Sequence, residues 1–203
     1  MQSTLKRQCR PRLVHLLLTL GALCLAGAPA TVAAQNVAEA PTSGTMTGTV
    51  NGEETEWRTV VLTTPDGEQN TASFTRMEMG PLTLFDFTLQ GHQGNDYVKH
   101  ALALSFGVFD EADLADCPCT IGDATATYWT TDSMFGQLYA GPVSLVIEAA
   151  TKHADDHYSL EGTFAGSLVY MESAGNVDED DLLEVDVSFG IERVDAEDLD
   201  LGS

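Results

Sequence analysis

The sequence predicts an all-β protein, built as a single antiparallel β-sandwich or small β-barrel of about nine strands. Along most of the chain, apolar and polar residues alternate with a period of two, which is typical of strands with one buried face. Gly, Pro, Asn and Asp interrupt these segments at short intervals, as they do at turns. Many short strands at such spacing are typical of antiparallel sandwiches and barrels.

The two clearest strand patterns lie near the C-terminus. In the segment 183–191 every second residue is apolar, and the residues between them are Glu, Asp, Ser or Gly. The segment 158–170 alternates almost as regularly. Residues 172–181 between the two segments are rich in Gly, Asn and Asp, so we expect a long hairpin with its loop there.

Seven more strands are expected earlier in the chain, separated by turn signals such as Asn51-Gly52 and Gly80-Pro81. Only the segment Asp110–Ala115 favours a helical turn, which the Asp110 side chain would cap. The expected strands are Gly44–Val50, Thr55–Leu62, Thr71–Met77, Leu82–Leu89, Val98–Val108, Thr125–Thr131 and Val143–Ala150.

A short internal repeat favours closure of the sheet. Residues 44–50 (GTMTGTV) resemble residues 162–168 (GTFAGSL), and in both segments two glycines flank a bulky residue on the same face. Glycine at inward positions lets a strand bend tightly, as barrels require. We therefore expect the first strand to lie near the last ones, with coincidence as the alternative explanation of so short a match.

The front of the domain resembles a group of exported bacterial proteins of unknown function. The resemblance rests on Val50-Asn51-Gly52 followed by Trp57, after a strand of small residues, and on the Gly-Thr-Phe strand at 162–164. It covers only a short part of the chain. It implies a β fold and export, and it assigns no functional residue.

The first 34 residues are expected to be a cleavable signal peptide. Basic residues at positions 6, 7, 10 and 12 precede the mostly apolar run Leu13–Ala26, which is too short to span a membrane comfortably. Small residues follow, and Val32-Ala33-Ala34 fits a signal peptidase site before Gln35. An uncleaved anchor helix and a lipoprotein modified at Cys24 are the alternatives. Both fit the sequence around the apolar run less well.

We therefore expect an exported protein, periplasmic or secreted, whose mature chain contains no transmembrane segment. Residues 35–43 are expected to be a flexible tail and residues 44–195 the β domain. Residues 196–203 are expected to form an acidic C-terminal tail.

The expected mature chain is strongly acidic. All 31 acidic residues follow position 34, but only five of the nine basic residues do, which leaves a net charge of −26. Nucleic acid and anionic membranes are poor partners for such a surface, because both require clustered Lys and Arg. The same charge would push the folded state apart in dilute salt, whereas molar salt would screen it. Two hypotheses follow, a halophilic protein and an ordinary acidic secreted protein.

Cys117-Pro118-Cys119 contains the only cysteines that follow the expected signal peptide. In an oxidising compartment a disulfide between Cys117 and Cys119 is the first expectation, although a ring closed across one proline is tight. Redox catalysis is disfavoured, because the four acidic residues between positions 110 and 116 would raise a thiol pKa. Cysteines that link to a partner or bind a metal are the alternatives.

Two segments have residue types that bind metals. His153, Asp155, Asp156 and His157 could hold zinc or copper, with His92 or His100 as a further ligand, although the same residues suit a polar hairpin turn. The acidic loop 176–184 offers oxygen ligands at alternate positions, as the front of a calcium loop does. It lacks the glycine and the closing glutamate of such loops, so a solvated acidic loop is the alternative. Its candidate calcium ligands are Asn176, Asp178, Asp180 and Glu184.

Tyr128, Trp129, Phe135 and Tyr139 form the densest aromatic stretch. If exposed, they could stack on a sugar or bind an apolar ligand. If buried, they would be core and loop anchors, as Trp57 is expected to be.

No catalytic or cofactor motif is present: the chain lacks a Gly-x-Ser-x-Gly elbow, a phosphate loop and a dinucleotide fingerprint. We therefore expect a non-catalytic binding or structural module of the cell envelope or medium, without a cofactor. Its partner could be a small apolar molecule, a glycan or an envelope protein. The alternative is an exported protein that binds a divalent metal through the His153–His157 segment or the acidic loop. A hydrolase with a dispersed carboxylate site is a third class.

Overall fold

The computed structural model describes residues 37–65, 67–173 and 176–197, and within these ranges the prediction of an all-β protein is confirmed. The expected signal peptide and all but the first two residues of the expected C-terminal tail lie outside the described residues. The elements are β1 (Thr42–Val50), β2 (Glu53–Thr64), β3 (Gly67–Asn70), β4 (Ala72–Met79), β5 (Leu82–Gly91), β6 (Leu102–Val108), α1 (Glu111–Ala115), β7 (Cys119–Trp129), β8 (Leu138–Lys152), β9 (His157–Ser173) and β10 (Asn176–Glu197).

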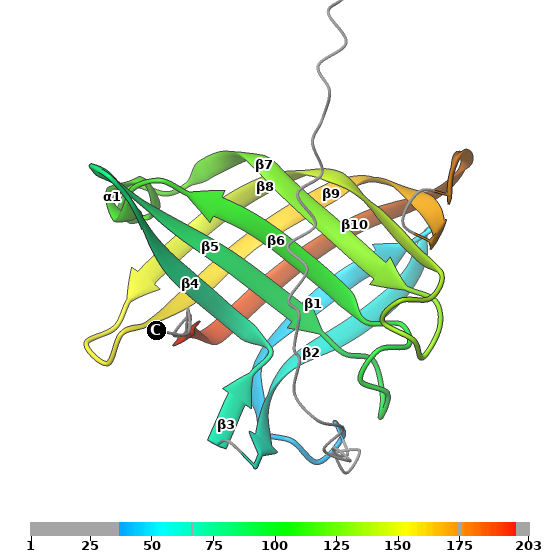
Figure 1. Cartoon of the computed structure of the whole chain (residues 1–203), viewed down its shortest axis with the longest axis horizontal. Helices are drawn as coiled ribbons and strands as arrows, with labels where there is room; N and C mark the ends of the chain where they lie inside the picture. The colour runs from blue at the N-terminus through cyan, green and yellow to red at the C-terminus, as the bar shows by residue number, and fades with distance from the viewer. Residues whose placement is uncertain (1–36, 66, 174–175, 198–203) are drawn as a thin grey trace, which may run out of the picture. The chain divides into compact units, whose positions relative to one another are not determined.

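The strands form one sheet in the order β3-β2-β1-β10-β4-β5-β6-β7-β8-β9, and β10 also pairs with β9. This additional pairing joins β4 through β10 into a closed ring, so the sheet is barrel-like. In Figure 1, β4, β5 and β6 cross in front of β8, β9 and β10. All neighbouring strands are antiparallel except β10 and β4, which run parallel over residues 195–197 and 73–75.

One edge of β10 is shared between two neighbours. Residues 185–191 pair with β1, and residues 195–197 pair with β4. The strands β1, β2 and β3 therefore form a flap on the ring. The flap returns to β5 through a bridge between Arg58 and His92, where each backbone N–H donates to the other residue's carbonyl oxygen.

The inside of the ring is filled by the apolar side chains that the alternation predicted. Phe87 and Phe106 stack with their ring centroids 5.0 Å apart, and Tyr158 meets Phe74 edge to face at 5.1 Å. These four side chains are almost completely buried, as is Phe164. The space between the strands is thus a packed core.

The internal glycine repeat corresponds to close strand contacts, and the expected neighbourhood of the first and last strands is confirmed. β1 pairs with β10, and β10 pairs with β9, which carries the second copy of the repeat. A Cβ atom added to Gly48 would lie 2.1 Å from the carbonyl oxygen of Asp186. One added to Gly162 would lie 2.4 Å from that of Val146. Both positions therefore require glycine where strands approach closely.

Several strand boundaries differ from the expected ones. Residues 98–101, expected as the start of a strand, lie in the loop before β6, because His100 has a φ of 62° and turns the chain. β7 and β8 begin earlier than expected, at Cys119 and Leu138. The additional strand β3 follows the turn at Pro65, where only a turn was expected. Residues 176–181, expected as a loop, belong to β10, because pairs such as Val177 with Met171 satisfy their backbone groups in the sheet. At the front, β1 begins at Thr42, and Val37 is fully buried beside Val60.

The expected helical turn is confirmed as α1. The side chain of Asp110 accepts a hydrogen bond from the backbone N–H of Ala112 at 3.0 Å, as an N-cap residue does. Leu114 is the residue of α1 that enters the core. None of the helices in the described ranges is long and apolar enough to cross a membrane.

The strand directions define two ends of the ring. One end, called here the α1 end, carries the β4–β5 turn, α1 and the β8–β9 turn. The other, called the Phe135 end, carries the β5–β6 loop, the β7–β8 loop and the β9–β10 turn. In Figure 1 the α1 end lies at the left and the Phe135 end at the right.

Candidate binding surface at the Phe135 end

The β7–β8 loop, residues 130–137, is held in shape by its own hydrogen bonds. The backbone N–H and the hydroxyl of Thr130 both donate to the carbonyl oxygen of Gln137, at 3.2 and 2.9 Å. The N–H of Gly136 donates to the carbonyl oxygen of Ser133 at 3.0 Å. The indole N–H of Trp129 donates to the carbonyl oxygen of Met134 at 3.3 Å, so the indole ring supports the loop.

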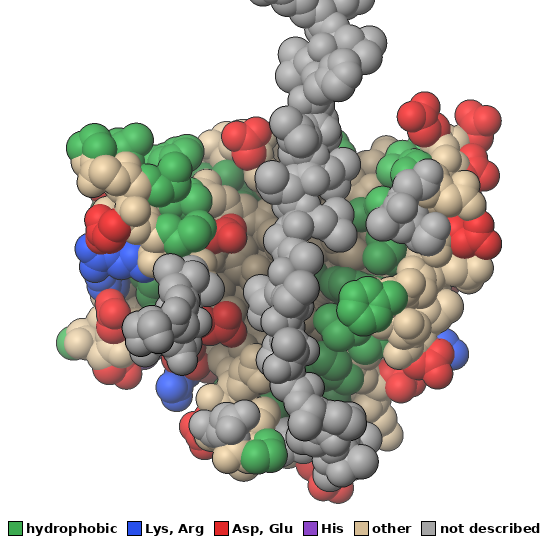
Figure 2. All heavy atoms as spheres, in the orientation of Figure 1, with side chains coloured by type: hydrophobic (Ala, Val, Ile, Leu, Met, Phe, Trp, Pro, Cys, Tyr) green, Lys and Arg blue, Asp and Glu red, His purple; other side chains and the backbone are tan. Residues whose placement is uncertain are grey.

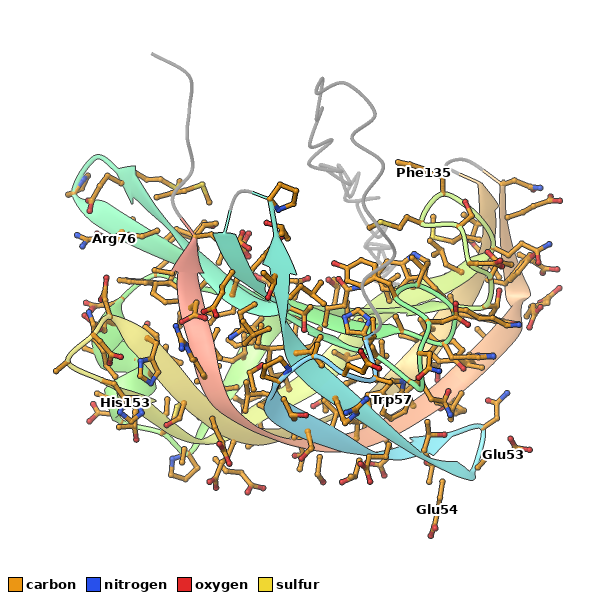
Figure 3. All side chains as sticks on the ribbon, turned by 90° about the horizontal axis from the view of Figure 1, so that it is seen from below. Glu53, Glu54, Trp57, Arg76, Phe135 and His153 are labelled. Carbon is orange, nitrogen blue, oxygen red and sulfur yellow. A yellow bond between two sulfur atoms is a disulfide. The ribbon has the colours of Figure 1, made fainter. Side chains whose placement is uncertain are left out.

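This loop presents Phe135 to solvent. The Phe135 side chain is 96% exposed, and the neighbouring Met134 is 50% exposed. Figure 3 shows Phe135 pointing away from the sheet. Its backbone N–H is fixed by the hydroxyl oxygen of Ser133, which accepts from it at 3.3 Å. A large aromatic side chain is thus held outside the protein by an ordered loop.

The loop lies next to the tip of the β9–β10 hairpin. Tyr139, just after the loop, donates its phenolic hydrogen bond to the carboxylate of Asp181 at 3.1 Å. Its ring also meets the ring of Tyr170 on β9 at 5.4 Å between centroids. Burial and the Asp181 carboxylate both raise the pKa of Tyr139, so its phenol keeps its proton and remains the donor.

The surroundings of Phe135 are acidic. The loop contains Asp132, and residues 172–182 at the hairpin tip contain five acidic residues, while neither segment contains a Lys or Arg. Figure 2 shows the same excess across one face of the molecule, with many acidic and few basic side chains. Val177 and Leu182 add exposed apolar surface at the hairpin tip. The surface therefore combines a projecting aromatic side chain with apolar and negatively charged neighbours.

The four aromatic residues expected as one group occupy different environments. Phe135 is exposed, whereas Trp129 and Tyr139 are half-buried at the base of the loop. Tyr128 is buried, and its hydroxyl lies 2.8 Å from Nδ1 of His100. Trp57 is fully buried as expected, and its indole N–H donates to the carbonyl oxygen of His100 at 2.8 Å. Of the four residues in the aromatic stretch, only Phe135 is exposed enough for its whole ring to contact another molecule.

The His153–His157 segment forms the polar turn that was one of its two interpretations. The two imidazole rings stack 4.3 Å apart, and Nδ1 of His157 lies 2.8 Å from the Asp155 carboxylate. Asp156 instead pairs with Lys152 at 3.4 Å. His92 and His100 belong to the Phe135 end, so neither joins this turn. Across the described ranges, no three His, Cys, Asp or Glu side chains are grouped to hold a metal ion.

The expected calcium ligands lie on β10 rather than on a loop. Asn176 contacts the carboxylate of Glu172, and the Asp178 side chain accepts from the backbone N–H of Asp180 at 3.1 Å. The Glu184 carboxylate accepts a hydrogen bond from Ser167 on β9. These polar groups therefore contact one another or the neighbouring strand. Cys117 and Cys119 form a disulfide with each other, as expected.

The structure contains two further polar features that the sequence did not predict. Tyr158 donates a hydrogen bond to Glu111, whose carboxylate also pairs with Lys152 at 2.7 Å, and this links α1 to the β8–β9 turn. His92 is fully buried, with Nδ1 2.7 Å from the carbonyl oxygen of Tyr97. Burial lowers the pKa of His92 to about 4. Both features join residues far apart in the sequence, which no local pattern indicates.

The surface of the described ring is hollowed in at least two places. One, of about 340 Å³, is at the α1 end, and its polar lining includes Asp155, Arg193 and Asp195. The other, of about 360 Å³, is on the outer face of β1, β8, β9 and β10, and its lining includes Thr47 and Thr163. No protein-family model, curated protein or solved structure matches this chain.

Proposed function

We propose that the protein is an exported, non-catalytic binding module that contacts a partner protein through the Phe135 end. The observation that carries the proposal is the 96% exposure of Phe135 on a hydrogen-bonded loop. Leaving Phe in water forgoes about 1.5–3 kcal/mol of burial free energy, which a partner with an apolar pocket would recover. Because the loop is already ordered, little conformational entropy is lost when it binds.

A protein partner fits this surface better than a small molecule does. A carrier of a small apolar ligand needs an internal cavity, whereas the ring of this protein is filled by buried aromatic side chains such as Phe87 and Phe106. A single projecting aromatic residue surrounded by polar groups is instead typical of a contact between proteins.

The charge around Phe135 specifies the chemistry of the partner. Six acidic residues and no basic residue occupy the loop and residues 172–182. The complementary surface is an apolar pocket bordered by Lys and Arg, which would attract this end at low salt. An anionic membrane carries the wrong charge. The proposed partner is therefore a basic protein of the envelope or medium.

The proposal is tested by comparing variants as bait. The mature chain is immobilised and exposed at low salt to envelope and secreted fractions from the native host. We expect a basic protein to be retained by the wild type and by Phe109→Ser, and to be lost from Phe135→Ser. Phe109 is the matched control because it is 54% exposed at the other end of the ring.

Phe135→Ser should leave folding unchanged, since the side chain contributes almost no buried area. Circular dichroism and a thermal melt would establish that. For a central contact residue the affinity loss should be about 2 kcal/mol or more, which corresponds to roughly 30-fold. Retention of the same proteins by Phe135→Ser would contradict the proposal.

A further inference from the structure

The last strand of the ring stops short of the end of its neighbour. β10 ends at Glu197, which lies opposite Thr75 in the parallel pairing with β4. β4 continues to Met79, and among the described strands its residues 76–79 pair with β5 alone. In Figure 3 the end of β10 lies beside β4, on which Arg76 is labelled. Within the described part of the chain, β4 is therefore open over four residues on its β10 side.

Exposed apolar side chains border this open edge. Met79 and Leu82, at the β4–β5 turn, are 52 and 53% exposed, and Met77 is half-buried. Figure 2 shows hydrophobic side chains gathered over this turn, at the upper left. Met77 and Met79 lie on the outer face of β4, because alternate residues share a face and Phe74 belongs to the core. An open edge beside exposed apolar side chains is a place where an extended segment can add to a sheet.

The chain itself contains a segment that fits this edge. The six residues after Glu197 read Asp-Leu-Asp-Leu-Gly-Ser and lie outside the described residues. The first four alternate between acidic and apolar, which is typical of a strand with one covered face. Neighbouring strands advance equally, by about 3.3 Å per residue, so these four residues would end level with Met79. Gly202 follows, and Gly disfavours a strand.

We propose that residues 198–201 extend β10 and pair in parallel with residues 76–79 of β4. This inference goes beyond the proposed function and does not depend on it. The register of the described pairs, continued by four residues, sets Leu199 beside Met77 and Leu201 beside Met79 on the outer face. Because the segment is attached to Glu197, it meets this edge at an effective concentration that a separate molecule rarely matches.

The charges of the segment make this pairing depend on salt. The same register sets Asp198 beside Arg76, which is favourable, and Asp200 beside Glu78, which is unfavourable. The ion pair of Glu78 with Arg76, at 2.6 Å, reduces that repulsion. The four acidic residues between positions 110 and 116 add negative charge at the α1 end. Molar sodium chloride shortens the screening length to about 3 Å, so it should strengthen the pairing.

Disulfide crosslinking tests the register. Aligned residues of neighbouring strands have Cα atoms about 4.8 Å apart, within the reach of a disulfide. The expected mature chain carrying Met77→Cys and Leu199→Cys should form this crosslink in molar salt with oxidised glutathione. In the matched control, Met79→Cys with Leu199→Cys, the two Cα atoms would be about 8 Å apart, beyond that reach. The control should therefore form little crosslink.

Tryptic peptides identify the crosslinked positions. Trypsin cleaves after Lys and Arg, so position 77 lies in peptide 77–99 and position 199 in peptide 194–203. Mass spectrometry without reductant should find these two peptides joined. Exchange with the disulfide between Cys117 and Cys119 would instead join one of them to peptide 100–152, which would count against the proposal. Equal crosslinking of both variants, or no product that joins 77–99 to 194–203, would overturn it.

A thermal melt in molar salt gives a second test without crosslinking. Leu201→Ser removes an apolar contact with β4 and should lower the melting temperature by about 2–4 °C. Asp200→Ser is the matched control, because it changes the preceding residue, on the other face, and removes the repulsion with Glu78. Its melting temperature should equal or exceed that of the wild type. If Leu201→Ser melts at the same temperature as the wild type, the segment does not cover the edge and the proposal is wrong.

Discussion

His92 illustrates how the fold changes the chemistry of a single side chain. Its Nδ1 lies 2.7 Å from the carbonyl oxygen of Tyr97, which fixes the neutral tautomer with the proton on Nδ1. Its Nε2 is buried without a hydrogen-bond partner in the described structure. Protonation would place a charged donor at Nε2 with no acceptor, which agrees with the lowered pKa.

The protonation of His92 predicts a loss of stability in mild acid. The pKa of His92 is about 4 in the folded state and near 6.5 in the unfolded state. As pH falls from 6.5 to 4, the unfolded state binds a proton that the folded state does not, so the folded state becomes less stable. Over this whole pH range, the free energy of unfolding should fall by about 3 kcal/mol.

Denaturant unfolding across this pH range checks the prediction. His92→Phe should remove this part of the pH dependence, whereas His153→Gln, on an exposed turn, should retain it. If the free energy of unfolding of His92→Phe falls with pH as steeply as that of the wild type, other groups cause the acid sensitivity.

At the scale of elements, α1 is joined to the ring by one polar contact group. The Glu111 carboxylate accepts from Tyr158 on β9 and pairs with Lys152 on β8. These two contacts lower the pKa of Glu111, and burial with the nearby carboxylate raises the pKa of Tyr158. The contact group thus keeps Glu111 charged and Tyr158 protonated in the neutral range.

Removing this carboxylate should destabilise the protein more than removing a neighbouring one. Glu111→Ala leaves the buried Tyr158 hydroxyl without its acceptor, which costs about 1–3 kcal/mol. The matched variant Asp113→Ala alters an exposed carboxylate on the same helix and should change stability by about 0.5 kcal/mol or less. Urea unfolding of the two variants measures the difference. Equal losses would mean that helix charge, rather than the contact with Tyr158, is responsible.

The side chains of the β8–β9 turn are not arranged to bind a metal ion tightly. Its two imidazoles stack, but Asp156 pairs with Lys152 and only Asp155 contacts an imidazole. A tight zinc site needs three or four converging ligands. We therefore expect protein purified from its native host to retain no stoichiometric metal in elemental analysis. A bound metal that is lost in His157→Ala would instead favour the metal-binding alternative.

Strand periodicity predicted most of the fold, because one face of nearly every strand is buried. The alternation in 183–191 and 158–170 predicted the hairpin of β9 and β10, and the glycine repeat predicted that β1 lies beside them. The polar run 176–181 was expected as a loop because Asn and Asp disfavour strands. Pairing with β9 outweighed that local preference.

The sequence predicted less of the candidate site. The aromatic stretch around Phe135 was identified, but exposure depends on which residues the loop turns outward, and Tyr128 is buried. The exposure of Met79 and Leu82 at the β4–β5 turn was not predicted, because the sequence of the hairpin does not reveal which of its faces is covered. His92 and Glu111 gain their roles from contacts between distant segments, which a single sequence does not reveal.

The whole molecule is governed by its net charge. In the described residues, three basic side chains at the α1 end form four ion pairs: Arg76 with Glu78, Lys152 with Glu111 and with Asp156, and Arg193 with Asp195. These basic residues cannot balance 31 acidic ones. Repulsion among the remaining carboxylates therefore opposes folding at low ionic strength.

We accordingly expect the melting temperature to rise with sodium chloride. Most of the rise should occur between about 0.01 and 0.15 M, where the screening length falls from about 30 to 8 Å. A melt series across this range measures it, with sucrose as a control that does not screen charge. A flat series would contradict the halophilic interpretation and leave an ordinary acidic secreted protein.

The central claim, that the Phe135 end binds a partner protein, is tested most directly by photocrosslinking in the native host. A photoreactive phenylalanine is placed at position 135 or, as a control, at position 54, where Glu54 points to the opposite side in Figure 3. We predict that position 135 gives one discrete crosslinked product, which contains a basic protein. Position 54 should not give that product. No product from position 135, or the same products from both positions, would contradict the claim.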